Sequence, residues 1–237
     1  MNRNRKDVLG ISDTAPYRKT LNPIFSLIPK TGGIMNLKNM TIALMISSGY
    51  AILLKLSHLF IPSLFHISSI PGITQMLSLI VGVIIILFLF LFYAEEKSNT
   101  KLETVLKILL GCFILNFLLR LPVIQGMIGF KAVRMTREII GFVNAVLLFA
   151  LLIIYKQGLP AGRQPIKQAA DFVTVMFGIG VIKSLSSLIT FTRFVLFGTE
   201  AVFPPAFYNI MFILFLFTHA SIIYFLYHYY KFKFTEK

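Results

Sequence analysis

Residues 101–130 read KLETVLKILLGCFILNFLLRLPVIQGMIGF, a polar opening followed by an apolar run that ends at Arg-Leu-Pro. The apolar part is about as long as the ~20-residue helix that crosses the ~30 Å hydrocarbon core of a bilayer. Five other runs of this kind flank it. The six predicted spans are Met40–Phe60, Ile73–Tyr93, Thr104–Ile124, Ile139–Tyr155, Asp171–Phe191 and Ala206–Tyr229. The sequence therefore predicts an all-α, polytopic membrane bundle of about six transmembrane helices. The fourth run is the shortest, which leaves open whether it crosses fully.

Composition supports a membrane protein. Of the 237 residues, 57% are hydrophobic and only 14% are charged, whereas soluble domains are close to half apolar and a quarter charged. The net charge of +14 would favour nucleic-acid binding in a soluble protein. Here the basic residues lie mostly in tails and between apolar runs. They indicate attraction to anionic lipid head groups and a positive-inside bias, and we expect no nucleic-acid partner.

The predicted domain organisation is simple. Residues 1–39 form a basic cytosolic tail, residues 40–230 a six-helix transmembrane domain, and residues 231–237 a short basic tail. Within the first tail, LNPIFSLIPK (21–30) is apolar but contains two prolines, which disfavour a long helix. It suits a short segment in the head-group layer, with a disordered tail as the alternative.

The distribution of Lys and Arg predicts the topology. With a cytoplasmic N-terminus, fifteen of the 23 Lys and Arg residues fall inside and four fall outside. The four are Arg120, Lys131, Arg134 and Arg137, all around the third loop, which is predicted to be external. This bias predicts a multi-pass protein of the plasma (inner) membrane with both termini cytoplasmic. Either these four basic residues bind a ligand on the outer face, or the fourth run does not fully cross the membrane.

Acidic residues are placed away from the predicted span cores. Glu138 and Asp171 are expected to open helices, where a carboxylate suits the N-terminal dipole. No intramembrane carboxylate is then available for a proton relay. The four histidines lack metal-ligand spacing, and the single Cys112 cannot form a cysteine metal site. Without catalytic motifs as well, the sequence predicts a protein that is not an enzyme and has no metal or cofactor.

Lys183 is the most informative basic residue, because it lies about twelve residues into the fifth run. Helical spacing places it on one face with Met176, Gly180, Ser187 and Thr190. A small and polar stripe is typical of a face packed away from lipid. We expect an anion site or a bridge to an acidic residue of another subunit; the alternative is a lysine that extends to one interface.

Three further residues complete the candidate contacts with a partner or anion. Asn116 and Arg120 are four residues apart on one face of the third run. Asn116 is expected to bond between helices and Arg120 to anchor the outer interface, whereas Asn144 on the fourth run is expected to serve in packing. Lys55 lies near the outer end of the first run and is expected to reach the interface. The full candidate set is Lys183, Gly180, Ser187, Asn116, Arg120 and Lys55.

Two stretches resemble the Yip family of small multi-pass membrane proteins, which interact with Rab proteins in eukaryotes. They are the proline-containing LNPIFSLIPK and the polar turn and helix SNTKLETVLKILLGCFILNFLLRLP. The similarity is one of layout over residues 20–190; the Asp-Leu-Tyr-Gly-Pro signature of eukaryotic members is absent, and six runs exceed the usual five. The resemblance implies a non-enzymatic protein that shapes bilayers or accompanies other machinery, including ATP-driven export systems that protect against peptides.

The leading hypothesis is therefore a non-catalytic integral membrane subunit that associates with other membrane subunits. An accessory subunit of an ABC-type exporter for peptide or toxin resistance is the form suggested by the resemblance. The alternative is a stand-alone transporter or channel for an anionic substrate or lipid, drawn in by Lys183 and Arg120. A membrane enzyme acting on lipid head groups is disfavoured, because no nucleophile or metal cluster is evident.

Overall fold

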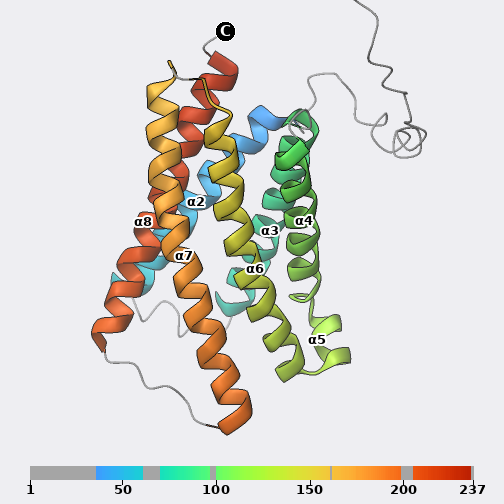
Figure 1. The fold of residues 1–237 in the computed structure, drawn as a ribbon. Coiled ribbons are helices and arrows are strands. Elements are labelled where there is room, and N and C mark those ends of the chain that lie inside the picture. The colour runs from blue at the N-terminus through green and yellow to red at the C-terminus, as the bar shows by residue number, and fades with distance from the viewer. Residues whose placement is uncertain (1–35, 61–69, 97–99, 161, 199–204, 236–237) are drawn as a thin grey trace, which may run out of the picture. The chain divides into compact units, whose positions relative to one another are not determined.

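The computed structural model describes residues 36–60, 70–96, 100–160, 162–198 and 205–235, and these are helical throughout except at short connections. The predicted interfacial segment in residues 21–30 lies outside the described residues. The helices are α2 (Leu37–Phe60), α3 (Ile70–Glu96), α4 (Thr100–Leu118), α5 (Pro122–Ile128), α6 (Phe130–Gln157), α7 (Gln164–Phe197) and α8 (Pro205–Tyr230), followed by the π-helical turn η3 (Lys231–Thr235) (Figure 1). The described residues contain no strand, so the all-α prediction is confirmed.

Five helices, namely α2, α3, α6, α7 and α8, are long and apolar enough to cross a membrane. The fourth predicted run belongs to α6, which has 28 residues and gives a candidate span at Lys131–Gln157. Its length is therefore sufficient to cross. At 34 residues, α7 is about 51 Å long, so it extends beyond the hydrocarbon core.

The third predicted run differs from the expectation, and a count of six spans is not confirmed. Its helix, α4, has 19 residues, of which Lys101, Glu103 and Lys107 are charged. It ends at Leu118 rather than at Ile124. The backbone N–H groups of the next turn bond three residues back, and Pro122 then begins the separate helix α5. Because proline restricts the residue before it away from helical geometry and is well suited to a first helical position, the break falls here.

The six long helices pack side by side in a closed order: α2, α3, α4, α6, α7, α8 and back to α2. α4 thus lies alongside α3 and α6 as a full member of the ring. Leu37 at the start of α2 and Tyr229 at the end of α8 belong to one buried cluster, so both described ends of the chain lie at the same end of the bundle. We call this the terminal end; α5 lies at the opposite end (Figure 1).

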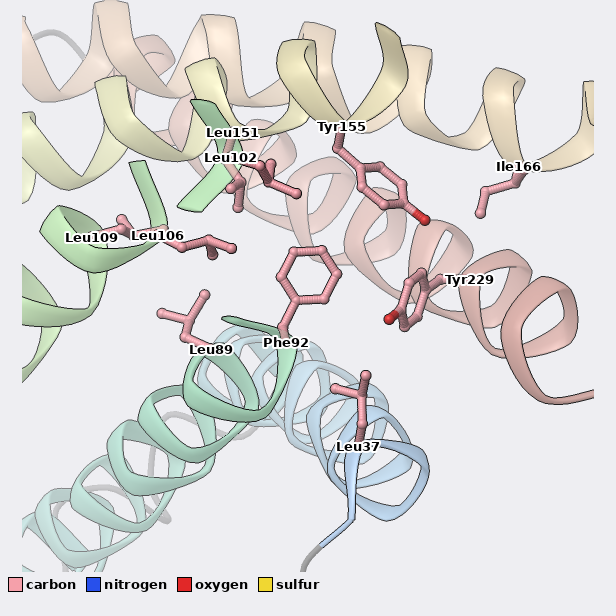
Figure 2. Packing of buried hydrophobic residues seen from close by; sticks show 10 residues of the cluster. All are labelled: Leu37, Leu89, Phe92, Leu102, Leu106, Leu109, Leu151, Tyr155, Ile166 and Tyr229. Atoms are coloured by element: carbon pink, nitrogen blue, oxygen red, sulfur yellow. The ribbon is translucent and has the colours of Figure 1, made fainter. Parts of the chain in front are cut away.

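A plug of apolar and aromatic side chains fills the ring at its terminal end. All six long helices contribute to it, through Leu37, Leu89, Phe92, Leu102, Leu106, Leu109, Leu151, Tyr155, Ile166 and Tyr229 (Figure 2). The ring centroid of Phe92 lies 5.8 Å from the ring centroid of Tyr155 and 5.8 Å from that of Tyr229. Both distances are within the range of favourable aromatic pairs. Leu106 and Leu109 are completely buried. The plug therefore closes the ring at this end.

Acidic side chains at the terminal end are paired with lysines. Lys233 of η3 contacts Glu95 at 3.2 Å and Glu96 at 3.1 Å, both at the end of α3. Lys107 bonds Glu103 at 2.8 Å, which confirms the pair expected from their spacing in the sequence. Asp171 pairs with Lys156 across the α6–α7 turn. The expectation that Asp171 opens a helix is wrong, because α7 begins seven residues earlier, at Gln164.

Candidate functional site

Four adjoining hollows lie in the ring beyond the plug, away from the terminal end. Hollow A has a volume of about 350 Å³, and its lining includes Arg134, Glu138, Lys183, Ser187 and Phe191. Hollow B, about 370 Å³, is lined by Asn116, Arg120, Val133, Arg134, Arg137, Glu138 and Gly141. The two share Arg134 and Glu138 of α6, so they adjoin at this helix.

The other two hollows lie nearer α8. The lining of hollow C, about 680 Å³, includes Lys55, Lys183, Tyr208, Met211, Phe212 and Phe215. The lining of hollow D, about 360 Å³, includes Asn116, Gly180, Asn144, Lys183, Thr218 and His219. Lys183 lines A, C and D, and Asn116 lines B and D. Because they share these residues, the four hollows adjoin one another, and we call the group the basic cavity.

All six residues singled out from the sequence line the basic cavity. Lys183, Gly180 and Ser187 come from α7, Asn116 from α4, Arg120 from the turn after α4, and Lys55 from α2. Lys183 and Ser187 are exposed, so this part of the stripe faces a hollow, whereas Met176 on the same stripe is buried. The prediction of an anion contact at these residues is compatible with this position.

Two arginines that the sequence assigned to an outer loop prove to be part of the cavity wall. Arg134 and Arg137 lie in α6, which begins at Phe130, so their placement in a loop was wrong. Gly129, with φ of 88°, turns the chain directly into the helix. The Arg134 guanidinium carbon lies 4.7 Å from the Phe191 ring centroid, a cation–π contact from α6 to α7.

Arg120 adds a third guanidinium to hollow B. Burial lowers the pKa of Arg120 below its ordinary value, and the nearby charge of Arg137 lowers it further. Because an arginine pKa begins far above neutrality, the group stays protonated. Hollow B therefore brings three arginines together with the one carboxylate of Glu138, so its described lining has a surplus of positive charge that favours a bound anion.

Glu138 is the acidic residue whose role the sequence missed. It was expected to open a helix outside a span core, but it is the ninth residue of α6 and lies inside the candidate span Lys131–Gln157. Its Oε2 accepts a hydrogen bond of 2.8 Å from Ser187 Oγ of α7. Among the described residues lining the four hollows, Glu138 is the only carboxylate. The i, i+3 spacing of Lys131, Arg134 and Arg137 was the sequence signal that this segment is helical.

Hollow C combines apolar walls with two ammonium groups. Lys55 Nζ lies 6.0 Å from the ring centroid of Phe215, and Lys183 lines the same hollow from α7. The remaining lining comes from α8 and is mainly aromatic and aliphatic, with Tyr208, Phe212 and Ile213 among its members. Such a lining suits an apolar chain that carries an acidic group at one end.

Hollow D lies between α4, α6, α7 and α8, and its lining is mostly apolar, with neutral polar side chains such as Asn116, Thr218 and His219 beside Lys183. Thr218 Oγ1 donates to the carbonyl of Leu214, and His219 Nδ1 lies 3.0 Å from the carbonyl of Phe215. Asn144 is only 6% exposed, and its Oδ1 has no hydrogen-bond partner. The packing expected for Asn144 agrees with this burial.

Metal binding finds no support in the part of the chain that the structure describes, where no group of three or more His, Cys, Asp or Glu side chains could hold an ion. Comparison of the chain with protein-family models, curated proteins and solved structures finds no match. The resemblance to the Yip family stays a prediction. The chemistry that the cavity offers is the binding of an anion next to an apolar slot.

Proposed function

We propose that this integral membrane protein binds an anionic amphiphile in the basic cavity and serves in the transport or sensing of that ligand. The observation that carries the proposal is the charge of the cavity wall. Among the described residues, the hollows are lined by five basic side chains and one carboxylate, that of Glu138; the basic residues are Lys55, Arg120, Arg134, Arg137 and Lys183. A surplus of positive charge within a membrane is costly unless it is hydrated or paired, and a bound anion offsets that cost.

The apolar lining supports an amphiphile over a small inorganic anion. Hollow C adjoins the basic walls of hollow A through Lys183 and Met211. An acidic head group among the arginines would leave its acyl chain next to the aromatic wall of α8, where apolar burial is favourable. Because the plug fills the ring at the terminal end, the ligand would enter the basic cavity from the opposite end only.

We further propose an orientation of the protein in the membrane. The charge bias of the sequence and the common location of Leu37 and Tyr229 support both termini on the cytoplasmic side of a plasma membrane. The basic cavity would then face the outer leaflet. Arg134, Arg137 and Arg120 would meet lipid head groups at the depth where acidic phosphates occur.

The test measures binding of a dispersed, short-chain phosphatidylglycerol to the purified protein, with phosphatidylcholine of equal chain length as the neutral reference. Hydrogen bonds to charged groups contribute about 1.5–3 kcal/mol. Arg134→Gln and Lys183→Met should therefore each weaken the phosphatidylglycerol affinity roughly 10- to 150-fold. Lys107→Gln, an exposed position near the terminal end, is the matched control and should bind like the wild type. Equal affinity of the wild type for both lipids refutes the proposal.

Association with a larger membrane complex, such as an ABC-type exporter, remains a prediction. α7 exposes Val175, Ile182, Ile189 and Leu196, but a face covered by lipid acyl chains shows the same apolar residues. Co-purification from native membranes with mass spectrometry tests the prediction, and recovery of the protein without any stoichiometric partner contradicts it.

A further inference from the structure

Two hydroxyl groups in the wall of hollow A are free to bond a ligand. The part of this wall that comes from α7 includes Lys183, Ser186, Ser187 and Thr190, which are spaced i, i+3, i+4 and i+7 and so lie on one face of the helix. Ser187 donates to Glu138. Within the described part of the chain, the hydroxyls of Ser186 and Thr190 make no hydrogen bond. Both can therefore donate to a molecule in hollow A.

Other threonines of the same helix use their hydroxyls differently. Thr174 Oγ1 donates to the carbonyl of Ala170 at 2.6 Å, and Thr192 Oγ1 donates to that of Leu188 at 2.8 Å. A bond to the preceding turn is a common way for a helix to satisfy a threonine hydroxyl. Thr190 is only two residues from Thr192 and lacks such a bond. The free hydroxyls are therefore a feature of hollow A and not of α7 as a whole.

Charged donors complete the wall of hollow A. Lys183 contributes an ammonium group from α7, and Arg134 contributes a guanidinium from α6. The Phe191 ring stacks on this guanidinium, 4.7 Å from its central carbon, and stacking leaves the N–H groups at the edge of the guanidinium able to donate. Guanidinium and ammonium groups both bind phosphate, the first through several donors and the second as a point charge. Hollow A therefore combines two cations with two hydroxyls from facing helices.

The charge of hollows A and B together exceeds that of a simple phosphodiester. Hollow B shares Arg134 with hollow A and adds Arg120 and Arg137. With Lys183 this makes four basic groups against one described carboxylate, that of Glu138, a surplus of three positive charges. A phosphodiester has one negative charge and two terminal oxygens. A phosphomonoester has a charge of about −1.5 to −2 near neutral pH and three terminal oxygens that accept hydrogen bonds.

Resting on the proposed function, we infer that hollow A binds the terminal phosphate of a lipid phosphomonoester such as phosphatidic acid. Arg134 and Lys183 contact the phosphate from facing helices, and Ser186 and Thr190 donate to its terminal oxygens. The acyl chains extend into hollow C, which shares Lys183 and Met211 with hollow A. The site thereby selects a phosphomonoester over a phosphodiester lipid that has the same acyl chains.

The experiment compares phosphatidic acid with phosphatidylmethanol, a phosphodiester that differs from it by one methyl group. Calorimetry measures the affinity of the full-length protein for short-chain forms of both lipids at about pH 8, where a phosphomonoester with a second pKa near 6 carries two charges. The wild type should bind phosphatidic acid at least tenfold more tightly, the effect of one further hydrogen bond to a charged group.

The same comparison separates this inference from the proposed function. Equal affinity for phosphatidic acid and phosphatidylmethanol, with phosphatidylglycerol still preferred over phosphatidylcholine, overturns only the phosphomonoester site. Failure of the wild type to bind any anionic lipid overturns both proposals. Neither outcome depends on a variant, so both hold even if a substitution in α7 prevents folding.

Variants of the two hydroxyls test the placement of the phosphate. Ser186→Ala and Thr190→Val should each weaken the binding of phosphatidic acid about tenfold and narrow its preference over phosphatidylmethanol. Thr192→Val is the matched control, because this hydroxyl already bonds the carbonyl of Leu188, and it should bind like the wild type. An unchanged affinity in Ser186→Ala and Thr190→Val, or an equal loss in Thr192→Val, overturns the placement.

The charge of the bound head group is measured separately with Glu138→Gln. Repulsion by the carboxylate is proportional to the charge of the ligand. The substitution should therefore raise the affinity for phosphatidic acid by roughly the square of the factor by which it raises that for phosphatidylmethanol. Equal factors for the two lipids overturn the binding of a dianion in hollow A.

A final arm distinguishes a lipid from a soluble organophosphate. Glycerol 3-phosphate has the same phosphomonoester but no acyl chains. It should fail to displace bound phosphatidic acid at millimolar concentration, because it lacks the part that occupies hollow C. Displacement at that concentration overturns the assignment to a lipid.

Discussion

Glu138 gives the sharpest test of the electrostatic reasoning, through the substitution Glu138→Gln. The carboxylate lines hollows A and B together with Arg134 and accepts a bond from Ser187. Glutamine keeps the size of the side chain and an oxygen that can accept this bond, so the change removes one negative charge and little else. An anionic ligand should then bind more tightly, because Glu138 repels it in the wild type.

The size of the effect follows from the dimensions of hollow A. A sphere of about 350 Å³ is about 9 Å across, so a bound anion lies within that distance of the carboxylate on the wall. At 6–9 Å and an effective dielectric constant of about 20, the repulsion is about 1.8–2.8 kcal/mol. Its removal should raise the affinity about 20- to 100-fold.

The assay is the dissociation constant of short-chain phosphatidylglycerol for the wild type and Glu138→Gln at low ionic strength. Glu103→Gln is the matched control, because its carboxylate bonds Lys107 near the terminal end and should not affect binding. With full water screening, the repulsion would still be about 0.5 kcal/mol, or roughly twofold in affinity. An unchanged or weaker affinity of Glu138→Gln therefore refutes the view that the ligand binds as an anion beside Glu138.

Two further predictions concern the ring itself. Leu106→Ala truncates a completely buried residue of the plug and should destabilise the protein by about 2–5 kcal/mol. The control Ile108→Ala, at a position that is 51% exposed, should lower the stability by less than about 0.5 kcal/mol. Denaturant unfolding in detergent measures both losses of stability, and equal losses contradict the role of the plug. If α4 crosses the membrane with its neighbours in the ring, single cysteines at Thr100 and Met127, in a background without the native cysteine, should react with an impermeant maleimide from opposite sides of sealed vesicles. Labelling of both from one side contradicts six crossings.

The apolar segments could be predicted from the sequence, because the length and apolarity of a segment are local properties. A run of about 20 apolar residues has no stable place in water, so the helices α2, α3, α6, α7 and α8 follow from composition alone. The ends of helices were less predictable. Residues Lys131 to Glu138, which include four charged side chains, are helical. The apolar run that follows them does not indicate that its helix begins several residues earlier. Glu138 and Asp171 were misplaced for this reason.

The candidate site was predictable only in part. Helical spacing placed Gly180, Lys183 and Ser187 on one face, and the structure shows that face lining the basic cavity. Arg134 and Glu138 joined them through the packing of α6 against α7, which depends on contacts between segments about 50 residues apart. Spacing within one helix contains no information on such contacts.

The sequence by itself determined that this chain is helical and that it contains segments long and apolar enough to cross a membrane, because apolarity and helical period are properties of each segment alone. Only the tertiary structure decided that the helices close into a ring, that aromatic packing fills one end, and that basic groups from three helices and a turn gather at the other. The physical reason is that packing and charge act between helices. Both depend on which side chains from other helices surround each residue, and the sequence alone does not specify those contacts.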